Sequence, residues 1–237
     1  MLYNFVDNIE LIAFIAIGTY VAVMLYRHIQ YRRTAYFQIT HKSYRSLDDG
    51  DYGEYLIYKM LKRLEKKGCK FLFNLYIPKS DGGTSEIDVL LISHKGVFVF
   101  ESKNFSGWIF GNQQQKSWTQ VLPAGRGYDS IKLNFYNPIW QNAGHILHLN
   151  KLIGKDIPAY SVVVFSDRCT LKDITITTDD VNVVYCHELK LLISEFYTNI
   201  KHDLLSLSDI EEIYNKLHPY TQVDSETKEQ HIDKQNR

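Results

Sequence analysis

Two short apolar runs joined by a turn constrain the fold of this chain more than any other feature. Residues 87–92 and 97–103 are almost continuously apolar at their centres and rich in Val, Ile and Phe, which is typical of strands buried on both faces. The four residues between them, Ser-His-Lys-Gly at 93–96, supply turn chemistry. The pattern therefore predicts an antiparallel hairpin in which Ile92 faces Val97.

Three charged residues interrupt these runs, where a strand core is expected to be apolar. The predicted register sets Asp88 directly opposite Glu101, with Cβ atoms roughly 5 Å apart, and Lys103 shares the face of Glu101. Two carboxylates so close repel each other unless a cation lies between them, and hard oxygen ligands suit Mg²⁺ or Mn²⁺. The hairpin is interpreted as a divalent-metal site with a lysine beside it. The alternative is a structural salt bridge, since Glu-x-Lys is common, and a one-residue slip of the loop would make the carboxylate contact diagonal.

Composition bounds the class of protein. With 237 residues, 45% of them hydrophobic and 23% charged, the chain can bury one globular core plus an appendage. The formal net charge of zero means that nucleic-acid binding must rest on a local patch. Cys69, Cys169 and Cys186 are widely spaced and lack a Cys-x-x-Cys pattern, which indicates reduced thiols in a cytosolic domain and argues against a disulfide framework or a zinc site.

The amino-terminal segment predicts a transmembrane helix. Residues 11–26 carry no charge, and apolar residues before them extend the run toward the 17 to 25 or so that cross a bilayer. Asp7 and Glu10 precede the run, unlike the basic start of a signal peptide. Basic residues follow it without an acidic residue until Asp48, so the positive-inside rule places the globular domain in the cytoplasm. The alternatives are a buried or interfacial helix and a basic stretch that lies against anionic lipid.

The remaining pattern alternates helices and strands. A helix is expected from Asp49 to about Gly68, in which Glu54 either complements the helix dipole or reaches toward the metal site. A strand at 69–77 and a second hairpin at 104–111 and 117–121 are expected around the first hairpin. Trp108 and Trp118 in the second hairpin either pack across the strands or stack on bases.

Asn137-Pro138 predicts another helix start, with Asn as the cap and Pro at the first position. Its expected apolar face is Ile139, Ala143, Ile146 and Leu147, and Gln141, His145 and His148 lie on a neighbouring stripe. Gln141 would bond a phosphate or position the lysine, whereas the histidines are interpreted as polar boundary residues. Further strands are expected at 160–165 and 181–185, with amphipathic helices at 188–200 and 208–217.

In order and spacing, several of these residues resemble the nuclease-related domain (NERD) family over about residues 48–165. The matching motifs are Gly53-Glu54, Glu86-Ile87-Asp88, the stretch from Gly96 to Asn104, Gly107, Trp118, and the stretch from Asn137 to Asn142. The resemblance implies a relationship to the restriction-endonuclease-like PD-(D/E)xK superfamily, with an α/β fold in which helices flank a central mixed β-sheet. It also implies that Asp88 and Glu101 bind the metal, that Lys103 orients or activates the attacking water, and that Glu54 and Gln141 complete the site, with Glu54 as a third metal ligand. Bacterial members often carry a transmembrane helix.

The expected organisation has five parts. They are a transmembrane helix with its flank (1–28), a basic juxtamembrane linker (29–47), the nuclease-like core (48–165), a strand and helix extension (166–220) and a disordered polar tail (221–237). The expected function is that of a nuclease dependent on Mg²⁺ or Mn²⁺, held in the cell membrane by a single-pass helix, that hydrolyses phosphodiester bonds of nucleic acid, with DNA as the expected form. The alternative is a catalytically silent module that binds or senses nucleic acid at the membrane.

Overall fold

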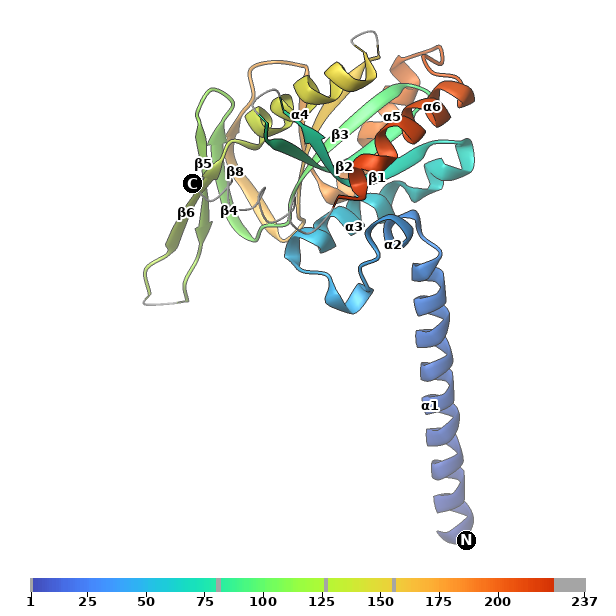
Figure 1. Ribbon diagram of the computed structural model, residues 1–237. Coiled ribbons are helices and arrows are strands. Elements are labelled where there is room, and N and C mark those ends of the chain that lie inside the picture. The colour runs from blue at the N-terminus through green and yellow to red at the C-terminus, as the bar shows by residue number, and fades with distance from the viewer. Residues whose placement is uncertain (1, 80–81, 126–127, 155–156, 224–237) are drawn as a thin grey trace.

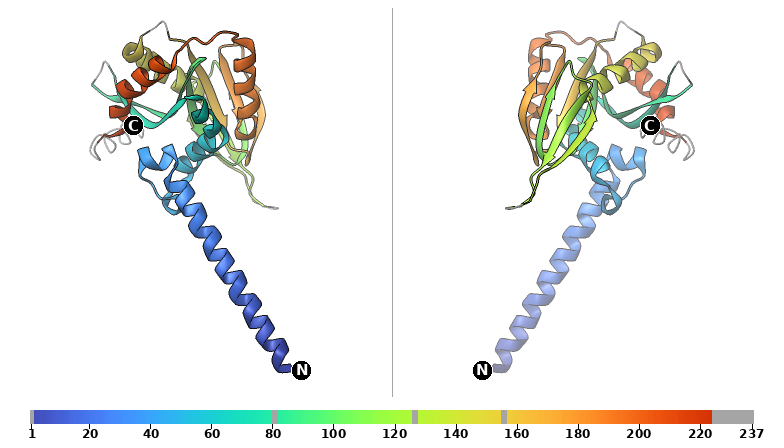
Figure 2. Two further views of the ribbon diagram at one scale, coloured as in Figure 1. Left: turned by 90° about the vertical axis from the view of Figure 1, so that its right-hand side faces the viewer. Right: turned by 90° about the vertical axis from the view of Figure 1, so that its left-hand side faces the viewer.

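The protein is a mixed α/β domain preceded by a long helix (Figure 1), as the sequence predicts. The computed structural model describes residues 2–79, 82–125, 128–154 and 157–223. The strands divide between two mixed sheets, where a single central sheet was expected, and helices lie on both sides of the larger sheet (Figure 2).

The helices follow the predicted order along the chain. Their bounds are α1 Leu2–Arg32, α2 Ala35–Thr40, α3 Asp49–Leu61, α4 Pro138–Ile153, α5 Leu189–Asn199 and α6 Leu207–Leu217, with short 3₁₀ segments η1 Tyr44–Ser46, η2 Lys62–Lys67, η3 Cys186–Glu188 and η4 His218–Thr221. Residues 29–47 therefore contain the end of α1, α2 and η1. Most of the polar tail, residues 224–237, lies outside the described residues.

Nine strands are present in the described residues and form two sheets. Their bounds are β1 Lys70–Pro78, β2 Thr84–Ser93, β3 Gly96–Lys103, β4 Gly107–Asn112, β5 Ser117–Leu122, β6 Ile131–Tyr136, β7 Ala159–Phe165, β8 Cys169–Thr175 and β9 Val181–Tyr185. The larger sheet has the order β1-β2-β3-β7-β9, and the smaller has the order β6-β5-β4-β8. Strands β6 and β8 were not predicted, although Ile131–Tyr136 alternates apolar and polar residues as a half-exposed strand does.

The register of the first hairpin is the predicted one. Strands β2 and β3 are antiparallel, and their pairs run from Ser93 with Gly96 through Ile92 with Val97. The last pair is Val89 with Phe100. Beyond it, β3 continues to Lys103 alongside the parallel strand β7, so the last residues of β3 are paired with β7 but no longer with β2.

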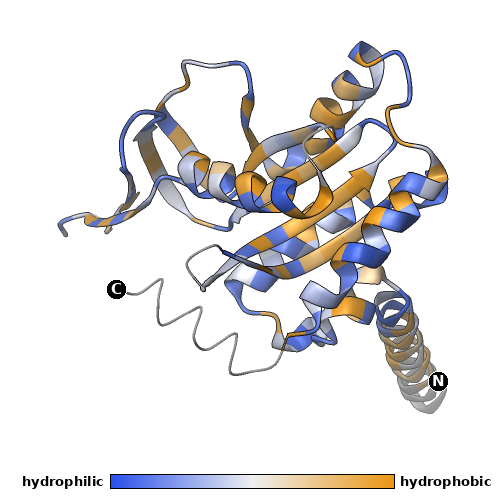
Figure 3. Ribbon diagram, turned by 45° about the horizontal axis from the view of Figure 1, so that its top comes forward, coloured by the Kyte–Doolittle hydropathy of each residue, from blue (hydrophilic) through white to orange (hydrophobic). Residues whose placement is uncertain are grey.

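The core lies on both faces of the larger sheet and between the two sheets. Apolar residues concentrate on these strands (Figure 3). Between the sheets, the Trp118 ring stacks on Phe165 with centroids 6.1 Å apart. Trp108 pairs across the ladder with Val121 rather than with Trp118, is 39% exposed, and has the Lys172 ammonium over its ring. The two tryptophans therefore do not pack against each other, since one is a core residue and the other lies on the surface.

Helix α4 begins as predicted, but the predicted apolar face is right only in part, because Ile139 is buried and Ile146 packs against the core whereas Ala143 and Leu147 are exposed. Asn137 caps the helix by accepting from the Ile139 N–H at 2.9 Å. Leu147, expected in the core, is 58% exposed. The buried face also carries Asn142 and His145, because polar groups of the sheet lie beneath this helix and offer hydrogen-bond partners.

Candidate active site

The site forms where β2 and β3 separate. Asp88 lies one residue beyond the last ladder pair, and its Oδ2 accepts a hydrogen bond from the Ser102 N–H at 2.8 Å. The Asp88 side chain therefore supplies a hydrogen bond between β2 and β3 at the point where their backbone ladder has ended. This bond holds Asp88 against the end of β3, which carries Glu101 and Lys103.

Glu101 is buried, 1% exposed, and both of its oxygens are bonded. Oε1 accepts from the Lys103 ammonium at 2.5 Å, and Oε2 accepts from His145 Nε2 at 3.1 Å. Burial alone would raise the pKa of Glu101, but the Lys103 charge and the His145 hydrogen bond outweigh burial and lower it. Glu101 is therefore an anion held by two donors.

Lys103 keeps its charge in this setting. Burial alone would lower the pKa of Lys103, but the nearby carboxylates of Glu101 and Asp88 raise it overall. Its amino group also donates to Gln141 Oε1 at 3.2 Å, from the first turn of α4. The amide of Gln141 thus positions the lysine, as one of the two sequence interpretations had it.

Glu54 reaches the same region from α3. The side chain is buried, 8% exposed, which favours the interpretation that it points inward over a role at the helix surface. The preceding residue, Gly53, allows the approach, because a Cβ there would lie 2.5 Å from Ser102 Oγ and 2.9 Å from Asn104 Cβ. Glycine is therefore required for α3 to lie directly on the end of β3.

A strand residue absent from the predictions, Asn74, also faces Glu54. Asn74 lies on β1 at the position across from Asp88, and its backbone has φ 51°, a left-handed conformation that Asn tolerates. Because the Glu54 carboxylate accepts hydrogen bonds, we assign the amide orientation in which the Asn74 nitrogen faces it, 2.7 Å from Oε2 and 3.2 Å from Oε1. Non-glycine residues in this conformation cluster at functional sites.

The three carboxylates repel one another. Burial raises the pKa of Asp88 well above its usual range, and the Glu101 charge raises it further. Burial likewise raises the pKa of Glu54, with Asp88 as the next largest cause. A cation placed among these groups would be stabilised by all three.

The donor set fits a hard divalent cation in chemistry and charge. Asp88, Glu101 and Glu54 supply carboxylate oxygens, the ligands that Mg²⁺ and Mn²⁺ prefer. Among the described residues, however, no three His, Cys, Asp or Glu side chains already converge on one point in a way that could hold a metal. Binding a cation therefore requires the three carboxylates to move closer to one point. It also requires Glu101 to contact the cation and the Lys103 ammonium at the same time.

His145 is a site residue that the sequence interpretation placed at a polar boundary. Since the Glu101 carboxylate can only accept, Nε2 of His145 carries a proton, and Nδ1 lies 2.7 Å from Ser85 Oγ. The spacing from Gln141 was the available signal, because residues i and i+4 lie on one face of a helix. The partner carboxylate lies 44 residues away in sequence, and only the fold reveals it.

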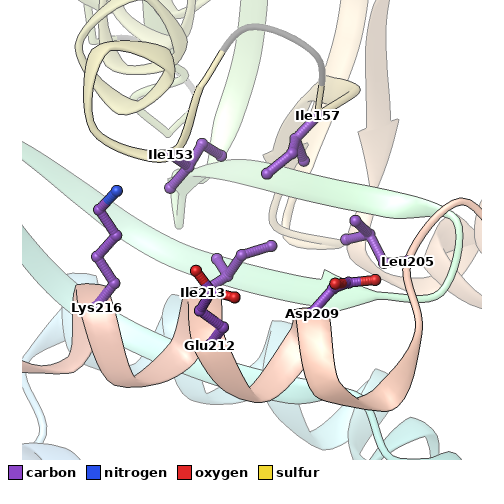
Figure 4. Close-up of a pocket in the computed structure, with 7 residues that line it drawn as sticks. All are labelled: Ile153, Ile157, Leu205, Asp209, Glu212, Ile213 and Lys216. Carbon is purple, nitrogen blue, oxygen red and sulfur yellow. The ribbon is translucent and has the colours of Figure 1, made fainter.

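Two further features lie outside the carboxylate cluster. At its rim, the Arg168 guanidinium donates to the Asn104 carbonyl at 2.8 Å and has a half-exposed side chain. A pocket of about 190 Å³ lies elsewhere, between α6 and the end of α4 (Figure 4). Ile153, Ile157, Leu205, Asp209, Glu212, Ile213 and Lys216 line this pocket. It contains none of the predicted site residues.

Comparisons with known proteins agree with this description. The family model described as nuclease-related domain matches residues 49–166. An uncharacterized protein of Bacillus anthracis is 32% identical over 183 residues, which cover 77% of this chain and 82% of the relative. No solved structure matches the chain.

Proposed function

Because the chain belongs to the nuclease-related domain (NERD) family, we propose that it is a membrane-anchored, divalent-metal-dependent nuclease that hydrolyses phosphodiester bonds of nucleic acid, with DNA as the expected substrate. The observation that carries the proposal is the group of residues at the diverging ends of β2 and β3. There Asp88, Glu101 and Lys103 meet Glu54 from α3 and Gln141 from α4.

Each residue has a definite part in this proposal. Asp88, Glu101 and Glu54 would hold Mg²⁺ or Mn²⁺, which supplies charge neutralisation and a more acidic bound water. The Lys103 ammonium orients the attacking water and stabilises charge that develops on the phosphate. Gln141 fixes the position of Lys103, and His145 fixes that of Glu101. The exposed Arg168 at the rim offers a second cation to the nucleic-acid backbone.

A metal titration of Asp88→Asn tests the metal site. Asn keeps an acceptor for the Ser102 N–H bond but removes one charge of the repelling set. Without metal, the melting temperature of the variant should equal or slightly exceed that of the wild type. The raised pKa of Asp88 has this sign, because the folded state loses stability relative to the unfolded state as the pH rises from the ordinary aspartate pKa to the raised one.

With Mn²⁺ or Mg²⁺ present, the wild type should melt at a higher temperature and the variant should not. A suitable control is Asp173→Asn, on strand β8 of the smaller sheet, which should keep the metal-dependent shift. If the wild type shows no shift in melting temperature with either metal, or if Asp88→Asn unfolds, the Glu101–Lys103 ion pair is structural and the metal assignment is wrong.

Membrane anchoring by α1 is the second part of the proposal. Residues Leu11–Arg32 are long and apolar enough to cross a membrane, and the apolar 18-residue window within them is not buried inside the protein. At about 1.5 Å per residue they span the roughly 30 Å hydrocarbon core. In Figure 1 the helix projects from the domain as a single rod. Basic residues on its carboxy-terminal side support a cytoplasmic position of the domain, by the positive-inside rule.

Fractionation tests this anchoring. The full-length protein should stay with membranes through high-salt and alkaline washes, and protease added to intact cells should leave most of the chain uncut. A version beginning at residue 29 should be recovered in the soluble fraction. Release of the full-length protein by salt alone would show a peripheral helix held by charge, and cleavage of the domain from outside would reverse the topology.

One observation favours a second function, that of a catalytically silent module that binds nucleic acid. Glu101 is already satisfied by Lys103 and His145, which is the closed network that a structural salt bridge predicts. In that case Lys103 is one phosphate contact among several, and the domain tethers nucleic acid at the membrane without cutting it.

A further inference from the structure

The end of α1 and the residues that follow it, ahead of the family match, are part of the folded core. We call residues 31–42 the connecting segment. Tyr31, Tyr36 and Ile39 are each at most 6% exposed. The Tyr36 ring meets Phe73 of β1 edge-on, with centroids 4.9 Å apart. The family match begins only at residue 49, so these contacts join the domain to residues outside it.

Within this segment, the Tyr36 hydroxyl reaches the candidate active site. It lies 2.9 Å from the Asp51 carbonyl oxygen and 3.3 Å from Glu54 Oε2. The hydroxyl can donate its proton to either acceptor. Asn74 approaches the same carboxylate from β1, so Glu54 lies between a tyrosine from α2 and an amide from the sheet.

A second contact fixes the connecting segment to the same turn of α3. The Lys42 ammonium forms an ion pair with Asp51, whose side chain is buried. At the other end, only Arg33 and Thr34 separate α1 from α2. Thr34 caps α2 by accepting from the Phe37 N–H at 3.3 Å. The connecting segment is therefore held on α3 through Tyr36 and Lys42 and follows α1 closely.

We propose that Tyr36 is a positioning residue for Glu54, so that the connecting segment forms part of the catalytic site together with the family domain. The inference rests on the proposed function, because it assigns Glu54 to the metal site. A neutral hydroxyl orients the Glu54 carboxyl group without adding a charge of its own, so it does not compete with a cation for that group. Groups of this kind behind a metal ligand typically change metal affinity or activity by about 10- to 100-fold when removed.

Two matched variants of the full-length protein in detergent test the proposal. Tyr36→Phe removes the hydroxyl next to Glu54 and keeps the ring. Tyr31→Phe removes a hydroxyl from the same segment, but that hydroxyl donates to the backbone carbonyl of Lys42 at 2.8 Å. Tyr36→Phe should raise the Mn²⁺ dissociation constant about tenfold or more and lower kcat, with KM for nucleic acid unchanged. Tyr31→Phe should change none of these.

A double-mutant cycle separates this inference from the proposed function. Tyr36→Phe and Glu54→Gln are combined, and unfolding by urea is measured without metal. If the hydroxyl holds Glu54, the change in the unfolding equilibrium constant of the double variant should differ by roughly three- to tenfold from the product of the changes in the two single variants. Additive effects, together with equal Mn²⁺ affinities of Tyr36→Phe and Tyr31→Phe, would overturn the proposal. If the wild type neither binds metal nor cleaves, the nuclease function fails, and the cycle alone decides whether Tyr36 holds Glu54.

Discussion

Lys103→Met is expected to lower the turnover number by roughly 10²- to 10³-fold while the protein keeps much of its affinity for nucleic acid. Met has a similar length and removes the ammonium with its hydrogen bonds to Glu101 and Gln141, and the charge of that group acts mainly on the attacking water and the developing transition state. Glu101 keeps its second partner, His145, so the fold should survive. The measurement is the cleavage rate and the equilibrium affinity for one oligonucleotide at two salt concentrations.

The matched control is Lys70→Met, because Lys70 pairs with Glu211 and lies opposite Ile92, at the far end of β2 from Asp88. It should cleave at the wild-type rate. Cleavage that persists unchanged in Lys103→Met would refute the role of Lys103 and point to a contaminating nuclease. Weaker binding with a flatter salt dependence, and no turnover to lose, would support the binding module.

The second large effect concerns where the folded unit begins. A fragment that starts at residue 45 loses the connecting segment, including the buried side chains of Tyr31, Tyr36 and Ile39. Burial of each such side chain contributes about 1.5–3 kcal/mol, a large part of the roughly 5–15 kcal/mol that stabilises a typical domain. The fragment should therefore be largely unfolded or inactive, although it contains the entire family match.

A fragment that starts at residue 29 is the control, because it also lacks most of α1 but keeps the connecting segment. Urea unfolding followed by circular dichroism should show one cooperative transition for this fragment and a far lower midpoint, or no transition, for the shorter one. Equal midpoints would show that the connecting segment adds nothing to the fold, and would also weaken the assignment of Tyr36.

The parts of the fold that depend on local signals could be predicted from the sequence. The hairpin register followed from a four-residue turn between two apolar runs, and the start of α4 followed from Asn137-Pro138. The neighbours of Glu101 could not all be predicted in this way. Lys103 could be predicted as a neighbour, because residues two apart along a strand share a face. His145 could not, because it meets Glu101 only once α4 lies on the sheet.

The prediction for residues 29–47 was limited in the same way, because it used local signals only. Their basic residues predicted a linker, since charge is the local signal there. Two of the aromatic residues among them are buried by contacts with other segments, Tyr31 with Tyr55 of α3 and Tyr36 with Phe73 of β1. Because such contacts join segments that are separate in sequence, the aromatic spacing alone did not indicate a packed segment.

The most direct test of the central claim is cleavage of labelled DNA and RNA, single- and double-stranded, by full-length protein in detergent. Wild type should cut at least one substrate with Mg²⁺ or Mn²⁺ and should not cut it with EDTA. Asp88→Asn, purified in parallel, should be inactive with either metal while remaining folded. Salt-sensitive binding by the wild type without cleavage in either metal would contradict the nuclease and leave a nucleic-acid-binding module at the membrane.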